Sequence, residues 1–116
     1  MTAWNLIPIK MKLGIVLYSN DPETVFQAFR LGTFALKKGD DVRMFMLAKG
    51  VECDTLDNEK WHISDQIRGF QDNGGKTYSC TSCLKIRDKK ESQVCPMSSL
   101  ADLYQIIAES DKLLTL

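Results

Sequence analysis

The chain has 116 residues, enough for one domain with a modest hydrophobic core and too few for two. Its 15 basic and 15 acidic side chains cancel, so its charge gives no reason to expect nucleic acid as a partner. No apolar run approaches the roughly 20 residues that cross a membrane, and no signal-peptide pattern opens the chain. We therefore expect a cytoplasmic protein with reduced cysteines and no membrane contact.

Residues 1–10 have no clear hydrophobic period, although they contain several large apolar side chains. We interpret them as an N-terminal extension. The alternative is an arm that packs on a neighbouring subunit. Residues 11–116 are predicted to form a single domain.

Strands and helices alternate from residue 12 onward. The nearly continuous apolar run 13–18 predicts a strand that is covered on both faces. A turn follows, in which Asp21 is placed to cap a helix and Pro22 to occupy its first position. Gly39 is predicted to end this helix. Its inward face is expected to contain Val25, Ala28, Phe29, Gly32 and Leu36.

The middle of the chain continues the pattern. We predict a second strand over residues 42–47, a loop over 48–56, a second helix over 58–73 and a third strand over 76–79. The inward positions of the second helix are predicted to be Ile63, Ile67 and Phe70.

A polar helix is predicted over residues 84–90 and a last strand over 112–116. Between them, the segment from Ser99 to Asp102 reads as a capping box that opens the final helix. The apolar stripe of that helix is predicted to be Leu100, Leu103, Tyr104 and Ile107.

This alternation predicts an α/β fold. Short loops between strands and helices favour three layers, α/β/α, around an open and mostly parallel sheet of four or five strands. The order of the strands is not readable from the pattern.

The segment Cys80-Thr81-Ser82-Cys83 carries the most chemical information, because it follows the third strand directly. In an open α/β sheet, ligands and chemistry collect at the carboxyl ends of the strands. A thiol at such a place meets the positive end of the next helix, which favours the reactive thiolate. Cys80 is therefore the leading candidate for a reactive cysteine.

The other cysteines leave several interpretations open. Cys53 lies in the loop after the second strand, and Cys95 shortly precedes the last helix. Cys80, Cys83 and Cys95, with or without Cys53, could hold a metal, although a repeated Cys-x-x-Cys pair would be the stronger signature. Cys80 and Cys83 could also form a thiol–disulfide switch. The simplest alternative is that Cys53 and Cys95 are small buried hydrophobic residues.

Several segments together resemble a known family. A strand leads through Asn20-Asp21-Pro22 into an aromatic-rich helix with a late glycine. A glycine-rich turn and short strand precede Cys80, and Arg87 follows seven residues later. Residues 97–103 are similar to the start of the last helix in this family. Residues 108–113 are similar to the segment that leads from that helix into the last strand. In this order, the segments resemble the DsrE/DsrF-like group of small sulfur-relay proteins, which includes the Tus sulfur carriers, over residues 11–116.

The resemblance implies a DsrE-like fold and a sulfur carrier or sulfurtransferase that passes sulfane sulfur as a persulfide on Cys80. Cys83 stands where an alanine is common in the family, and Cys83 and Cys95 would be a second sulfur acceptor or a resolving thiol. Ser19, Asn20 and Arg87 are the expected contacts to substrate or partner. Arg87 is otherwise simply a surface charge.

Family members often assemble around a symmetry axis. The resemblance therefore implies a homo-oligomer, a trimer, hexamer or dimer. The expected partners are sulfur donor and acceptor proteins, and no cofactor is expected.

Overall fold

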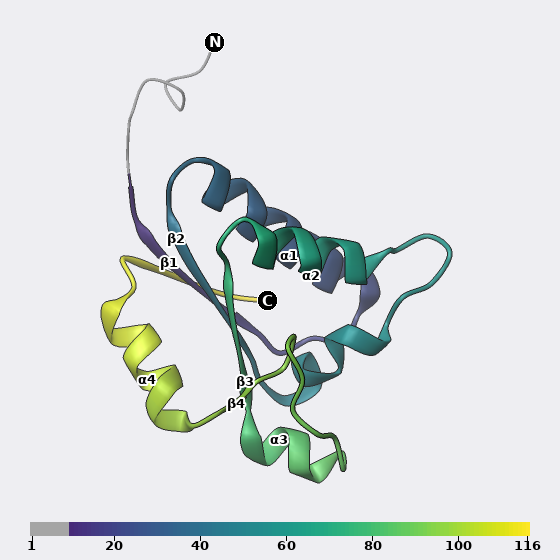
Figure 1. The fold of residues 1–116 in the computed structure, drawn as a ribbon. Helices are drawn as coiled ribbons and strands as arrows, with labels where there is room; N and C mark the ends of the chain where they lie inside the picture. The colour runs from purple at the N-terminus through teal and green to yellow at the C-terminus, as the bar shows by residue number, and fades with distance from the viewer. Residues whose placement is uncertain (1–9) are drawn as a thin grey trace.

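The computed structural model describes residues 10–116, so the predicted N-terminal extension lies almost entirely outside the described residues. The described chain forms one five-stranded sheet in which every strand is parallel to its neighbours, in the order β4-β3-β2-β1-β5 (Figure 1). The predicted α/β fold with an open sheet is thereby confirmed. The strands are β1 (Lys12–Leu17), β2 (Asp41–Met46), β3 (Lys76–Cys80), β4 (Met97–Ser98) and β5 (Lys112–Thr115).

The helices make the outer layers. Helices α1 (Pro22–Lys37) and α2 (Ile63–Asp72) lie side by side on one face of the sheet, and α4 (Leu100–Glu109) lies on the other (Figure 1). The short helix α3 (Thr81–Ile86) follows β3 at the carboxyl edge of the sheet. A 3-10 helix, η2 (Ala48–Thr55), occupies the connection that was predicted to be a loop.

The first helix begins and ends as the sequence predicts. The Asp21 carboxylate accepts the backbone N–H of Thr24 at 2.9 Å, and Pro22 is the first helical residue. Gly39 adopts a φ of 99° directly after the helix, a conformation that favours glycine. This capping fixes the point at which the chain leaves β1 and turns back over the sheet.

The second helix is shorter than predicted. It starts at Ile63 instead of residue 58, because the Asn58 carboxamide oxygen accepts the backbone N–H groups of Lys60 and Trp61 and holds a turn there. The inward positions Ile63, Ile67 and Phe70 are buried, as predicted.

Two apolar clusters flank the sheet. The larger one fills the space between the sheet and helices α1 and α2, and includes Ile15, Met44, Phe29 and Phe70. The smaller one lies on the side of α4 and consists of Phe45, Cys80 and Ile106 with partly buried neighbours. Side chains of adjacent strand residues point to opposite faces, so β2 contributes Met44 to the larger cluster and Phe45 to the smaller one.

The orientation of α4 differs from the prediction. The capping box of Ser99 and Asp102 is present, but the buried residue of the helix is Ile106, while Leu100 and Tyr104 are about 70% exposed. Gly14 explains the difference. A Cβ atom at this position of β1 would approach Ile106 to 3.1 Å, so the bare backbone lets the helix dock through Ile106. Leu100, Tyr104 and Ile107 of the predicted stripe therefore face outward, whereas Leu103 packs against the smaller cluster, as predicted.

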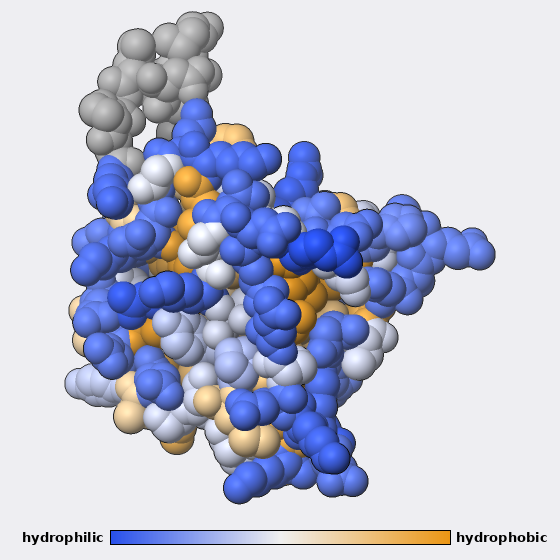
Figure 2. All heavy atoms as spheres, viewed as in Figure 1, coloured by the Kyte–Doolittle hydropathy of each residue, from blue (hydrophilic) through white to orange (hydrophobic). Residues whose placement is uncertain are grey.

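The face shown in Figure 2 is mostly hydrophilic, and hydrophobic areas appear there only between charged and polar side chains. Among the described residues, no helix is both long and apolar enough to span a membrane.

Candidate functional site

Cys80 is the last residue of β3 and the N-cap of α3. The helix predicted over residues 84–90 in fact begins at Thr81, immediately after the cysteine. No loop therefore separates the strand from the helix, and the thiol lies next to the first backbone N–H groups of α3. Only 5% of the surface of Cys80 is exposed.

The Cys80 and Cys83 thiols form an interacting pair, and both cysteines are free. Burial raises the pKa of Cys80, but hydrogen bonds from Ser82 and Cys83, side chain and backbone, outweigh it and lower the pKa overall. The Ser82 hydroxyl lies 3.2 Å from Cys80 Sγ. Burial and the neighbouring Cys80 raise the pKa of Cys83. Cys80 is thus the thiol of this pair that ionises more easily.

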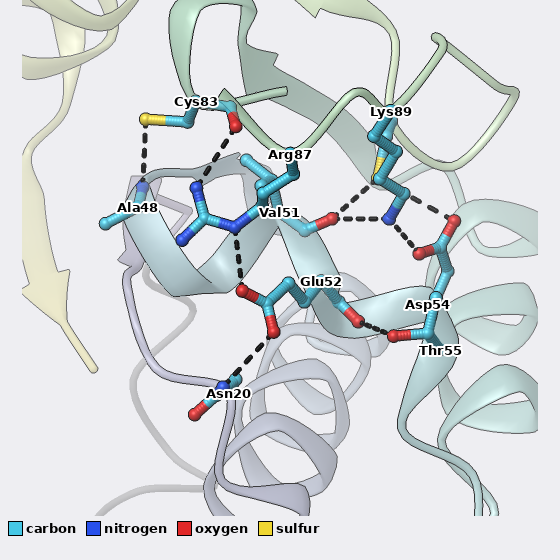
Figure 3. A network of polar contacts seen from close by, with 10 residues as sticks. Asn20, Ala48, Val51, Glu52, Asp54, Thr55, Cys83, Arg87 and Lys89 are labelled. Carbon is cyan, nitrogen blue, oxygen red and sulfur yellow. Dashed lines mark hydrogen bonds and ion pairs between the residues drawn. The ribbon is translucent and has the colours of Figure 1, made fainter. Parts of the chain in front are cut away.

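Cys83 receives a hydrogen bond from another segment of the chain. The backbone N–H of Ala48 donates to Cys83 Sγ over 3.2 Å (Figure 3). Ala48 has a φ of 52°, an uncommon value for a residue other than glycine. Such a backbone conformation persists only where the surrounding structure holds it in place. Here it orients the Ala48 N–H toward Cys83 Sγ.

Polar contacts tie η2 to α3 beside the thiols. Arg87 Nε donates to the Glu52 carboxylate at 2.7 Å, and its Nη1 donates to the Cys83 carbonyl at 3.1 Å (Figure 3). Asn20 Nδ2 completes the group by donating to the other Glu52 oxygen at 3.2 Å. Arg87 and then Asn20 lower the pKa of Glu52, which keeps the carboxylate ionised.

The structure thus brings together Cys80, Cys83, Asn20 and Arg87 from the predicted set. Ser19 has a local role, because its hydroxyl accepts the backbone N–H of Asp21 in the turn.

Cys95 belongs to a different place. It is fully buried in the larger apolar cluster and interacts with Cys53, whereas Cys80 belongs to the cluster on the side of α4. Strand β4 also separates it from the last helix. The four cysteines therefore form two pairs, and Cys95 does not share the site of Cys80.

The whole of this domain matches the model of one protein family. The DsrE/DsrF-like family model covers residues 11–116. The chain belongs to this family. Membership supports a role in sulfur relay in general terms.

Solved structures share the DsrE-like fold at low sequence identity. The ychN protein from E. coli superposes with a TM-score of 0.80 at 19% identity, over 93% of this chain and 100% of that one. A conserved protein of unknown function from Bacteroides thetaiotaomicron gives a TM-score of 0.73 at 14% identity, over 90% and 94% of the two chains. No curated protein matches the sequence.

A metal site built from the four cysteines finds no support in this DsrE-like domain. Across residues 10–116, no group of three or more histidine, cysteine, aspartate or glutamate side chains is arranged to hold a metal ion. The division of the cysteines into two pairs accounts for this, since a closed tetrahedral thiolate site needs all four to converge.

Three residues of the site were not predicted. Ser82 lies inside the Cys-x-x-Cys segment, two residues after Cys80, so its contact with Cys80 could have been predicted from the sequence. Ala48 and Glu52 reach the site only because η2 follows β2, which is the neighbour of β3 in the sheet. Strand order is not encoded in local patterns, and no sequence signal pointed to them.

Proposed function

We propose that this protein is a sulfur carrier that holds sulfane sulfur as a persulfide on Cys80. The observation that supports this most directly is the lowered pKa of a thiol at a junction of strand and helix. A thiolate is the nucleophile in sulfur exchange, so the easily ionised thiol is the one that should accept sulfur. Family membership adds a general sulfur-relay role.

The transfer needs no outside oxidant. The Cys80 thiolate attacks the outer sulfur of a donor persulfide, a sulfur–sulfur bond forms, and the bond between the two donor sulfurs breaks. The donor leaves as a thiolate and takes up a proton. Delivery repeats the exchange, with an acceptor thiolate attacking the outer sulfur of the Cys80 persulfide. One sulfur–sulfur bond is exchanged for another at each step.

The neighbouring groups have defined parts in this proposal. The Ser82 hydroxyl and the backbone N–H groups of Ser82 and Cys83 stabilise the Cys80 thiolate before sulfur is loaded and again after it is delivered. Cys83 is more exposed than Cys80 and touches it, so it is the candidate to pass sulfur outward. Arg87 is held beside the thiols by Glu52 and the Cys83 carbonyl, and its side chain, which is 26% exposed, is the proposed contact to a partner.

The proposed partners are donor and acceptor proteins with cysteines of their own, and the proposed compartment is the cytoplasm, where thiols remain reduced. We also propose a homo-oligomer, supported by the apolar residues that α4 leaves exposed: Leu100, Tyr104 and Ile107.

Intact-mass analysis tests the carrier. Protein purified without oxygen is incubated with glutathione persulfide and should gain the mass of one sulfur atom. The Cys80→Ser variant should show no gain, since the two side chains are close in size but the hydroxyl cannot hold sulfane sulfur. The matched control, Cys83→Ser, removes the neighbouring thiol and should still load.

Two results would contradict the assignment. Loading that persists in Cys80→Ser and disappears in Cys83→Ser would move the carrier to Cys83. Loss of two hydrogen atoms from the wild type, mapped to an internal disulfide in the tryptic peptide 77–85, would identify a thiol–disulfide switch instead.

A further inference from the structure

Cys53 and Cys95 form a second thiol pair that the proposed transfer does not use. Cys53 lies in η2 and Cys95 in the segment just before β4, and neither exposes any measurable surface. The Cys95 thiol lies 3.8 Å from the Val51 carbonyl oxygen and 4.0 Å from an Asp54 carboxylate oxygen, so it packs against η2 on both sides of Cys53. Both cysteines belong to the larger apolar cluster. Two thiols from distant parts of the chain are therefore held close together inside the protein.

The surroundings of this pair are polar, although it is buried. Ser79 Oγ is buried and has no hydrogen bond of normal geometry within residues 10–116, but it lies close enough to lower the pKa of Cys95. At the edge, the Lys89 ammonium donates to the Val51 carbonyl at 2.6 Å and pairs with Asp54 (Figure 3). A buried hydroxyl without a hydrogen bond destabilises the folded state, so such a group in a native structure calls for an explanation.

The two thiols are not equivalent. The Cys53 thiol, together with Ser79 and the charge of Lys89, lowers the pKa of Cys95 to about 7, against the opposing effects of burial and Asp54. Cys95 and burial raise the pKa of Cys53. Cys95 is thus the thiol of the pair that ionises first, and Cys53 remains protonated beside it.

We propose that Cys53 and Cys95 are oxidised to an internal disulfide by a peroxide, as a modification site separate from Cys80. The position of Cys95 Sγ against Val51 and Asp54, which flank Cys53 in η2, supplies the geometry. The buried Ser79 hydroxyl supplies a donor for the sulfur anion on which oxidation begins. Hydrogen peroxide is small and uncharged, so it reaches a buried thiol more readily than a charged or bulky oxidant does.

The reaction balances with one peroxide. The Cys95 thiolate attacks one peroxide oxygen, the oxygen–oxygen bond breaks, and the leaving hydroxide takes a proton to become water. Cys95 is then a sulfenic acid. Cys53 attacks its sulfur, the sulfur–sulfur bond forms, and the sulfur–oxygen bond breaks. The second water leaves with the Cys53 proton. Two thiols are oxidised, and one peroxide is reduced to two waters.

The disulfide would affect the site of Cys80 and Cys83 through η2. Cys53 lies in the same short helix as Ala48, which donates to Cys83, and Glu52, which holds Arg87. A covalent bond would hold η2 to the segment before β4, whose Pro96 carbonyl accepts the Ser79 N–H of β3 at 3.0 Å. The bond would thereby restrict the movement of η2 beside the Cys80 pair.

Tryptic mapping tests the proposal cleanly, because the cysteines fall on three different peptides. Cys53 lies on 50–60, Cys95 on 91–112, and Cys80 with Cys83 on 77–85. Folded, reduced protein is treated with one equivalent of hydrogen peroxide near neutral pH, quenched with an alkylating reagent and digested without reductant. We expect a cross-linked product of 50–60 and 91–112 that disappears on reduction.

Variants separate this pair from the first site. The double variant Cys80→Ser/Cys83→Ser keeps Cys53 and Cys95 and should give the same cross-link, whatever the fate of the persulfide proposal. Cys53→Ser, whose hydroxyl keeps a hydrogen-bond donor beside Cys95, should give no cross-link and leave Cys95 as a sulfenic acid, which dimedone traps when it is added together with denaturant. A wild-type or double-variant digest in which 50–60 and 91–112 stay separate, or are joined only after unfolding in guanidinium, would overturn the proposal.

Discussion

Cys80 and Cys83 are three residues apart, yet their surroundings shift their pKa values in opposite directions. Cys80 gains hydrogen bonds from the start of α3, which stabilise its charged form. Cys83 has the Cys80 sulfur as a neighbour, and the amide of Ala48 compensates only in part. One thiol of the pair is therefore prepared to attack, while the other serves as its hydrogen-bond donor.

Alkylation at different pH values should display this asymmetry. With iodoacetamide, the rate at each cysteine should rise with pH through its own pKa, below the ordinary value of 9.0 for Cys80 and above it for Cys83. Fragment spectra of peptide 77–85 assign the label to one cysteine or the other. The midpoint of each profile reports the pKa, whereas the plateau reports access.

The measurement is independent of the burial of Cys80, because poor access lowers its plateau without moving the midpoint. A lower midpoint for Cys83 than for Cys80 would show that the first thiolate forms at Cys83, and the carrier role would have to be assigned to that residue.

At the scale of elements, the site depends on how closely η2 approaches the end of β1. Gly50 makes this approach feasible, since a Cβ atom there would lie 1.9 Å from the Leu17 carbonyl oxygen. Backbone would have to move to relieve that contact. Ala48, Glu52 and Cys53 all belong to this helix, so both thiol pairs depend on the same close contact.

Gly50→Ala should accordingly lower the free energy of unfolding by about 3 kcal/mol, the upper range for overpacking a tight interior. Urea denaturation of the purified variant measures this. Gly69→Ala is the matched control: its added Cβ meets nothing within 4 Å inside α2, and it should raise stability by about 0.5 to 1 kcal/mol. Equal effects of the two substitutions would show that η2 is not tightly packed.

Local signals predicted the elements well, because caps and hydrophobic periods act over a few residues. Asp21, Gly39 and the capping box at Ser99 are examples. The inward face of α4 was predicted correctly at Leu103 and wrongly at its other positions, because the bare backbone of Gly14, on a distant strand, leaves room for Ile106. The pairing of Cys95 with Cys53 could not be predicted either, since it depends on strand order. The sequence therefore indicated Cys80 and its pair but not the second pair.

For the whole molecule, the outward stripe of α4 is the clearest candidate for contact between copies of the chain. Leu100, Tyr104 and Ile107 follow one another at helical spacing and are 70%, 69% and 48% exposed. Leu113 of the edge strand β5 lies on the same side of the sheet as α4 and is also more than a third exposed. Exposed apolar residues that gather in this way favour an interface.

Light scattering at low micromolar concentration should give two, three or six times the monomer mass of 13.1 kDa. Tyr104→Lys should shift the protein toward the monomer, because a charge in an apolar interface is costly. Gln105→Lys adds the same charge to the adjacent, exposed position and should leave the assembly intact. A wild-type mass near 13.1 kDa would refute the oligomer.

The order of the strands has a consequence for how the chain acquires its structure. β1 comes first along the described chain but pairs with β5, the last strand, and the Lys12 amide bonds to the Asp111 carboxylate across 99 residues. During synthesis, β1 can join β2 early and yet must keep its other edge open until β5 emerges. Closing such a long loop is slow, and an open edge invites pairing with other chains. Delayed emergence of the last strand is therefore the step at which a nascent chain is most exposed to aggregation.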